Sequence, residues 1–325
     1  MWRAEITKTD GKVEDITQRV GSVRWSDSTD QLGAEFSFSI PFSKWDENFK
    51  SLSIAPGSLF RLYNGSTLWF QGIITTTPVN DSEYSGYDLS WYLNQSTTTI
   101  QFKKIRADKA IKQLCSKFGV PVGTISTMKT TIKATYKDKT PADIIKSILK
   151  KAKAETGVSH RLEMKNGKLC ITKLSRIEIT PTYIDELGRR IPCVNTAEIT
   201  GSRSIEEMKN SVTYTGKAKG KKKKTVKVTA KSSLSIKKYG LISTVVSADN
   251  LTTAKARQRA KNKLKSLNKV TVTLDCRMRG SILIRPGRWI QFPKSGIGAS
   301  GWFKVKSCTH EIVGDDYFVE MEMTN

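Results

Sequence analysis

The sequence has few histidines, few cysteines and no long apolar run. Its 325 residues include two histidines, His160 and His310, and five widely spaced cysteines that form no CxxC pair. Two isolated histidines do not make a Ser/His/Asp or Cys/His arrangement, or a zinc protease helix. No run approaches the ~18 apolar residues of a membrane span, and the N-terminus lacks the apolar part of a secretion signal. We therefore expect reduced thiols and a cytoplasmic origin, with no enzyme activity, cofactor, metal or membrane anchor.

Acidic residues are scarce in most of the chain, although not at its start. The formal net charge is +25, yet the first hundred residues carry 8 Lys/Arg against 12 Asp/Glu, and the remainder carries 47 against 18. Basic surface is thus confined to the C-terminal two-thirds and needs a local explanation there. The residues that we expect to form a basic patch are Lys217, Lys219, Lys221, Lys222, Lys223, Lys224, Lys255, Arg257, Arg259 and Lys261.

The basic residues fall into two segments with different expected structures. The Lys-rich segment 216–238 is predicted to be an exposed loop or mobile hairpin, because unpaired lysines are costly to bury. The segment 250–266 is predicted to be a basic helix whose narrow apolar stripe leaves its other faces toward a partner or an inner channel. DNA could bind such charge through counterion release, but no helix-turn-helix, zinc finger or RNP-like motif accompanies it. An acidic protein partner is preferred, and nucleic-acid binding is the alternative.

Residues 1–100 have the alternation of apolar and polar side chains that is typical of strands. Glu35-Phe-Ser-Phe-Ser-Ile40 alternates with period two. Short strands, glycine punctuation and scattered aromatics predict a small antiparallel β-barrel or sandwich.

Residues 101–175 change to a mixture of helix and strand. Apolar residues follow one helical face from 107 to 118, and Thr140-Pro-Ala-Asp is a strong start for a second helix. Gly157 can end that helix, and a hairpin follows that turns at Asn166-Gly167. We therefore expect a small α+β domain of two helices and a hairpin.

Residues 176–325 return to strand patterns, interrupted by the Lys-rich loop and the basic helix. The whole sequence thus predicts an α+β fold that is mainly β. Its three domains are an N-terminal β-barrel (1–100), the inserted α+β domain (101–175) and a second β-barrel (176–325).

Two stretches echo each other across the α+β insert. In each, apolar-x-Pro-Gly is followed by a strand, a turn, an aromatic pair and a second strand: 54–73 and 284–305. Proline sets φ to about −65° and glycine supplies the positive φ of a tight turn, so Pro56-Gly57 and Pro286-Gly287 are predicted structural turns of one shared geometry. We infer an internal duplication; the alternative is a coincidence of two common turns.

In their order along the chain, these features resemble the baseplate hub proteins of contractile tails. The similarity is carried by the block from Pro56-Gly57 to Gly72, by the helix-hairpin unit 140–174, by the segment 195–214, and by the helix that leads to 280–287. These hubs are of the late control D type, and the resemblance is greatest to the XkdQ/YqbQ-like hubs of PBSX-type prophages and R-type bacteriocins. The Lys-rich loop departs from that pattern.

The resemblance implies a structural protein and not an enzyme. It implies a homotrimer with two tail-tube-like β-barrel domains per subunit, which would adapt the hexameric tail tube to the trimeric spike of a contractile injection system. The implied partners are the tail tube protein, the spike protein, the tape-measure protein and other baseplate proteins. The protein would be assembled in the bacterial cytoplasm and become part of a phage virion or a bacteriocin particle. Two barrels in each of three subunits make a ring of six, and the internal echo is what that arrangement would require.

Overall fold

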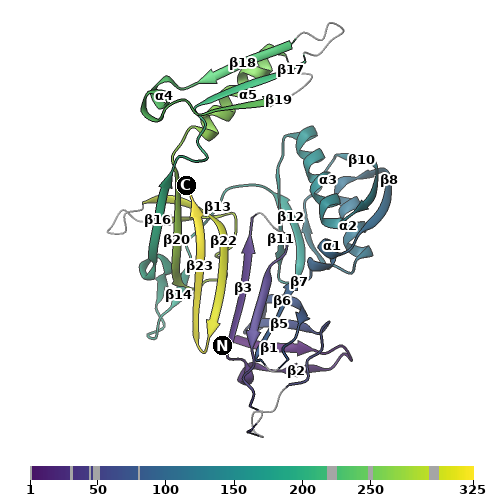
Figure 1. The fold of residues 1–325 in the computed structure, drawn as a ribbon. Helices are drawn as coiled ribbons and strands as arrows, with labels where there is room; N and C mark the ends of the chain where they lie inside the picture. The colour runs from purple at the N-terminus through teal and green to yellow at the C-terminus, as the bar shows by residue number, and fades with distance from the viewer. Residues whose placement is uncertain are drawn as a thin grey trace. The chain divides into compact units, whose positions relative to one another are not determined.

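The chain folds into two compact units. The computed structural model describes residues 2–29, 32–43, 45–46, 52–79, 81–217, 225–247, 252–292 and 300–325. Unit 1 comprises residues 1–199 and 275–323, and unit 2 comprises residues 200–274 and 324–325. Figure 1 shows the elements of both units.

One large sheet dominates unit 1. Its strands are β1 (Trp2–Thr7), β2 (Val13–Asp15), β3 (Ser22–Ser28), β4 (Glu35–Ser39), β5 (Leu59–Asn64), β6 (Thr67–Thr76), β7 (Glu83–Asp88), β13 (Ile177–Ile179), β16 (Glu198–Ser204), β20 (Thr271–Arg279), β21 (Arg288–Phe292), β22 (Gly301–Val313) and β23 (Asp316–Thr324). Among the described residues these thirteen strands follow the order β16-β20-β23-β22-β3-β4-β7-β6-β5-β1-β2, with β21 beside β22 and β13 beside β21. The path has two free ends and does not close on itself within that part of the chain.

The two β regions of the sequence meet inside this sheet. Strand β3 pairs antiparallel with β22, in a register that sets Trp25 opposite His310. Figure 1 shows this meeting as a purple strand beside a yellow one. The N-terminal and C-terminal strands therefore form one continuous sheet, and the division into two separate barrels stays a prediction.

Alternation along the strands creates the aromatic core of the sheet. Phe36 and Phe38 of β4 are buried, whereas Glu35 and Ser37 are not. The Phe38 ring stacks on Phe60 of β5, with centroids 4.7 Å apart. Burying a side chain of this size stabilises a fold by about 1.5–3 kcal/mol, so the alternation predicted for residues 35–40 has a direct energetic consequence.

The inserted α+β part has its own core. It contains α1 (Trp91–Gln95), β8 (Thr98–Arg106), α2 (Ala107–Lys117), β9 (Val122–Ile125), β10 (Thr131–Lys139), α3 (Pro141–Thr156), β11 (His160–Lys165) and β12 (Lys168–Lys173). Its apolar side chains, including Ile111 and Leu114 of α2 and Ile144 and Ile148 of α3, form one buried cluster. This is the predicted helix-and-hairpin arrangement, with the additional short helix α1.

The predicted boundaries of α3 and of the hairpin are confirmed. The Thr140 side chain accepts a hydrogen bond from the Asp143 N–H, and Gly157 ends the helix in the left-handed region. Both Asn166 and Gly167 have positive φ, at 51° and 71°, between the paired strands β11 and β12. Local side-chain chemistry was enough to locate these elements.

Unit 2 is a three-stranded sheet with helices. Its strands β17 (Ser211–Lys217), β18 (Thr225–Lys231) and β19 (Ser243–Ser247) lie in the order β18-β17-β19, and its helices are α4 (Ser233–Tyr239) and α5 (Thr253–Leu267). The remaining short elements of the chain are η1 (Thr17–Arg19), η3 (Cys193–Thr196) and the hairpin of β14 (Thr182–Ile184) with β15 (Arg190–Pro192).

For 216–238 the prediction is an exposed loop or mobile hairpin; the loop alternative is wrong for most of that segment, whereas β17 and β18 do pair antiparallel as in a hairpin. Gly216 and Lys217 end β17, residues 225–231 form β18 in a regular antiparallel pair with β17, and residues 233–239 form α4. In β18, Val226 is buried while Lys227 and Lys231 on the other side of the strand are exposed. Strand pairing satisfies the backbone while the ammonium groups stay in water, so a high lysine content does not exclude a strand. Residues 218–224 lie outside the described residues.

The fold class is confirmed as α+β and mainly β. The basic helix is also present, although it begins at Thr253 and ends at Leu267 instead of spanning 250–266. The Thr252 hydroxyl caps it by accepting from the Lys255 N–H. The division into three domains at residues 100 and 175 stays a prediction.

Candidate functional site

The two Pro-Gly turns have the same backbone geometry. Gly57 has φ of 92° and Gly287 has φ of 79°. The Gly57 N–H donates to Ile74 O at 2.8 Å, and the Gly287 N–H donates to Val305 O at 2.7 Å. The residue two positions after each glycine pairs across the hairpin, Leu59 with Ile73 and Trp289 with Lys304, and in each case the acceptor is the residue that follows this partner. The echo in the sequence is therefore an echo in backbone structure, while duplication as its origin stays a prediction.

The surroundings of the two turns differ. Pro56 and Gly57 are exposed, whereas Gly287 is buried. Arg161 of β11 covers Gly287, since its Nη2 donates to Gly287 O at 3.1 Å and to Ser175 O at 3.2 Å. The second turn thus anchors the α+β insert to the large sheet, and the first turn has no such role among the described residues.

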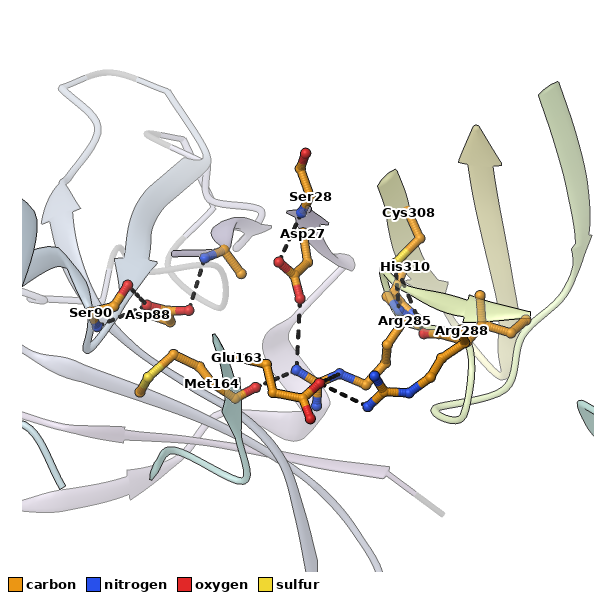
Figure 2. A network of polar contacts seen from close by, with 12 residues as sticks. Asp27, Ser28, Asp88, Ser90, Glu163, Met164, Arg285, Arg288, Cys308 and His310 are labelled. Atoms are coloured by element: carbon orange, nitrogen blue, oxygen red, sulfur yellow. Dashed lines mark hydrogen bonds and ion pairs between the residues drawn. The ribbon is translucent and has the colours of Figure 1, made fainter. Parts of the chain in front are cut away.

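A charged junction surrounds the second turn, and Figure 2 shows its parts. We use this name for Asp27 of β3, Glu163 of β11, and Arg285 and Arg288 at the start of β21. Arg288 Nη2 lies 2.8 Å from Glu163 Oε2, and Arg285 lies 3.7 Å from Asp27 and 4.0 Å from Glu163. Arg285 also donates to the Met164 carbonyl. The junction ties together three segments that are far apart in the sequence.

Burial shifts the protonation of the carboxylates in and beside this junction. Desolvation raises the pKa of Asp27 to about 6, although Arg285 acts in the opposite direction. Desolvation also raises the pKa of Asp88, despite hydrogen bonds from Ser90 and the Ala34 N–H. Figure 2 shows Asp88 with these donors, apart from the arginines. Each shift follows from moving a charge out of water.

His310 lies behind the junction in an aromatic stack. Its ring lies parallel to Trp25 with centroids 4.6 Å apart, its Nδ1 is 2.6 Å from the Tyr317 hydroxyl, and its Nε2 is 3.5 Å from Cys308 Sγ. Burial, with a smaller contribution from Arg285, lowers the pKa of His310 to about 3. The imidazole is therefore neutral near pH 7 and acts here as a hydrogen-bonded core side chain.

The predicted basic patch is only partly described. Lys219 and Lys221–Lys224 lie outside the described residues, and Lys217 is the last residue of β17. Lys255, Arg257, Arg259 and Lys261 are all exposed on α5. Only Ala256 and Ala260 of this helix are fully buried, and Ala256 lies against Val226 of β18. The described part of the patch is thus a helix surface that points away from its own sheet.

Several further properties are plain from the described residues. All five cysteines are free and buried, and burial raises the pKa of Cys115 to about 11 and that of Cys276 to about 12. Within the described ranges, no three His, Cys, Asp or Glu side chains are grouped so that they could hold a metal ion. Nor does any helix in those ranges have the length and apolar character needed to cross a bilayer.

Sequence reasoning missed the junction. Asp27, Glu163, Arg285 and Arg288 belong to no motif, and each is a single charge in or beside a strand. One signal was available: the second Pro-Gly turn is flanked by arginines on both sides, and the first is not. Arginine beside a buried turn is a common way to satisfy carbonyls and carboxylates together.

The fold defines a class of protein. Over 99% of this chain and 97% of the other, the structure matches the 43 kDa tail protein of prophage MuSo2 from Shewanella oneidensis, with a TM-score of 0.68 and 12% identity. A chain of the Francisella PdpA-VgrG complex matches 100% of this chain over 58% of its own length, with a TM-score of 0.54 and 8% identity. The chain has the fold of phage tail and baseplate-type structural proteins.

Sequence comparison then gives the family. The chain belongs to the YQBQ-like family, whose profile matches residues 23–324. It is 27% identical over 286 residues to the phage-like element PBSX protein XkdQ of Bacillus subtilis (strain 168), which covers 86% of this chain and 84% of that relative. The expected resemblance is thereby confirmed at the level of a phage tail baseplate-type protein.

Proposed function

We propose that this protein is the hub of the baseplate of a contractile tail or tail-like particle. Three copies would form a ring that adapts a hexameric tail tube to a trimeric spike. The observation that carries the proposal is the pair of Pro-Gly hairpins, which share turn geometry and register and lie in one continuous sheet. Two equivalent hairpins in each subunit give six in a trimer, which is the number that a sixfold tube would meet.

The free sheet edges support assembly between copies. Among the described residues, β16 and β2 end the path of the large sheet, so each has one side without a strand partner. Unpaired strand edges favour pairing with another chain. The acidic first hundred residues and the basic remainder would also attract each other head to tail, which favours a cyclic arrangement over a twofold one.

The proposed partners follow from this position. They are the tail tube protein, the spike protein, the tape-measure protein and other baseplate proteins, which the hub would join in the bacterial cytoplasm before release of a virion or a bacteriocin particle. No catalytic role is assigned to any residue. The buried, paired state of the junction supports a structural role, since its charges are used on one another.

Electron cryomicroscopy of the assembled particle tests the proposal. The expected result is three copies at the base of the tube, with the β5–β6 and β21–β22 hairpins at equivalent positions about sixty degrees apart around the axis, as sixfold geometry requires. Six copies, or hairpins in unrelated positions, would contradict it. A monomer in solution would not, because the ring can depend on tube or spike.

A second candidate function is nucleic-acid binding through unit 2. The favouring observation is α5, which exposes Lys255, Arg257, Arg259, Lys261, Lys263 and Lys265 with no acidic residue in the helix. Like charges three or four positions apart repel by about 0.2–0.5 kcal/mol per pair, and a polyanion would relieve that cost. Retention of a DNA duplex that falls steeply with salt concentration would favour this function, and retention of acidic proteins alone would favour the hub.

A further inference from the structure

A cavity lies next to the charged junction, at the place where the α+β insert meets the large sheet. Its volume is about 350 Å³, and its walls come from the end of β3, from α3, from β11, from the second Pro-Gly turn and from β22. Binding sites for small ligands and short peptide segments usually have volumes of about 300–1,000 Å³. The cavity lies within unit 1 and is separate from the sheet edges used in the proposed trimer.

The polar wall of the cavity contains a donor without an acceptor. Arg161 is 8% exposed, its Nη2 is used on two backbone carbonyls, and its Nη1 has no hydrogen-bond partner among the described residues. The neighbouring Arg288 is also 8% exposed and has an unpartnered Nη1. A buried charged donor left unpaired costs several times more than an ordinary hydrogen bond contributes. Arg288 is paired with Glu163 through its Nη2 and does not line the cavity, so Arg161 is the arginine that an anion in the cavity would satisfy.

The charges around the cavity favour a single negative charge. Lys146 of α3 and Lys304 of β22 line it together with Arg161. The two carboxylates in its wall, Asp27 and Glu163, already face Arg285 and Arg288. A dianion such as phosphate would be repelled by these carboxylates more strongly than a monoanion would. Carboxylate also matches the planar fork of a guanidinium.

The rest of the wall is apolar and extends outward. Leu32, Leu149, Leu162 and Leu174 line the cavity, and Leu174 is 53% exposed at the surface. An exposed leucine beside a charged pocket offers contact area to a chain that continues past the anion, which a free small anion could not use.

We propose that this cavity binds an extended peptide segment of a partner protein, in which a Glu or Asp side chain reaches Arg161 and flanking apolar residues contact the leucines. Charge complementarity selects the carboxylate, and the exposed leucine rim selects a peptide over a free anion. The proposed peptide site depends only on residues of one chain. A negative binding result would therefore leave the trimer proposal standing, and a negative result for the trimer would leave the peptide site standing.

The chain contains its own reporter for this test. His160 lines the cavity, and His310 is buried elsewhere in the sheet core. Since these are the only two histidines, histidine-selective isotope labelling gives two ring signals in an NMR spectrum. Burial and Lys173 lower the pKa of His160. A carboxylate bound nearby raises it, whereas His310 should not respond.

The probes are two capped tripeptides, acetyl-Leu-Glu-Leu-amide and acetyl-Leu-Gln-Leu-amide, with sodium acetate as the small-anion control. We expect the Glu peptide to shift the His160 signal saturably and to raise its pKa, with no change at His310. The Gln peptide should bind at least about tenfold more weakly, because it lacks the charge-assisted bond. Acetate should need a far higher concentration than the Glu peptide.

Variants separate binding from folding. Arg161→Met should weaken binding of the Glu peptide by at least about tenfold, but this variant also loses the two hydrogen bonds from Arg161 to backbone carbonyls. The double variant Lys146→Gln/Lys304→Gln removes two charges at the edge of the cavity and should weaken binding of the Glu peptide about two- to fivefold. Lys150→Gln, an exposed lysine of α3 outside the cavity, is the matched control and should have no effect.

Three outcomes would overturn the proposal. If acetate shifts His160 as readily as the Glu peptide does, the cavity binds small anions only. If neither peptide shifts His160 at tens of millimolar, or if both bind equally, the guanidinium does not select a carboxylate.

Discussion

The two Pro-Gly hairpins of this chain share one backbone geometry but lie in different environments. At the first, the turn at Gly57 is exposed, and a Cβ built there would have only the Thr9 methyl within 4 Å, at 3.5 Å. At the second, a Cβ on Gly287 would lie 3.4 Å from Arg161 Nε. The comparison shows that turn geometry is set locally by Pro-Gly, while the stabilising role of a turn is set by what packs on it. Four substitution experiments follow from this contrast, in order of decreasing expected effect.

Removing the Glu163 carboxylate from the junction should lower the free energy of unfolding more than the other substitutions do, because it weakens the attachment of the second hairpin. In Glu163→Gln, Arg285 and Arg288 lose a shared partner in a setting where their side chains are only 17% and 9% exposed. Breaking a buried pair in this way costs about 3–5 kcal/mol of the free energy of unfolding. Tryptophan fluorescence in urea measures it, since all seven tryptophans lie in unit 1.

The matched control is Glu155→Gln on α3, where the Lys151–Glu155 pair is about half exposed, at 42% and 46%. This change should cost less than about 1 kcal/mol. Equal effects of the two substitutions would mean that the junction does not stabilise the second hairpin.

Alanine at the two turn glycines tests the comparison directly. Both positions need positive φ, so Gly57→Ala should cost about 1–2 kcal/mol from backbone strain alone. Gly287→Ala should cost about the same, because its methyl group would meet Arg161 Nε at 3.4 Å, an ordinary van der Waals distance like the 3.5 Å to the Thr9 methyl at Gly57. Urea midpoints of the two variants decide this, and clearly unequal losses would show that the surroundings of the turns, and not backbone strain alone, set the cost.

The pH dependence of stability should differ after Asp27→Asn. The folded pKa of Asp27 is about 6 against 3.8 unfolded, so between about pH 4 and 6 the folded state binds more protons and acidification stabilises it. The folded pKa of His310 is about 3 against 6.5, so acidification through the same range destabilises the fold. The two effects oppose each other.

Asp27→Asn removes only the first effect, so the variant should lose stability more steeply than the parent from pH 6.5 to pH 4.5. Urea midpoints at both pH values for both proteins provide the measurement. Parallel slopes would show that Asp27 titrates normally in the folded protein.

The smallest effects are expected at the prolines. Pro56→Ala and Pro286→Ala should each cost about 0.4–1 kcal/mol, because the ring acts mainly by restricting the unfolded chain. Similar losses at the two sites would support one shared turn design. A much larger loss of stability at Pro286 would show that the packing of this proline in the cavity wall contributes more than the restriction that its ring places on the unfolded chain.

Sequence patterns predicted those elements that local chemistry controls. The cap at Thr140, the end of α3 at Gly157 and the Asn166-Gly167 turn each depend on residues within a few positions of one another. The shared geometry of the Pro-Gly hairpins was predicted for the same reason. Mainly-β content and the basic helix followed from periodicity.

The features that sequence reasoning missed depend on distant residues or on a misjudged charge. The junction joins residues 27, 163, 285 and 288, which only the folded chain brings together. Strand β18 was assigned to an exposed loop or mobile hairpin because of its lysines, although Val226, Val228 and Ala230 alternate with polar residues as a regular strand requires. Period two was the better guide there than composition.

The pairing of β3 with β22 has a consequence for how the protein is made. Strand β3 leaves the ribosome well before its partner β22, which follows only after the α+β insert and unit 2 have been synthesised. At translation rates of about 5–20 residues per second, β3 would wait for many seconds with one edge open. Unit 2, whose sheet is built from residues 211–247, can complete that sheet during the same interval. The large sheet can therefore be completed only after β22 has been synthesised, later than the strands of unit 2.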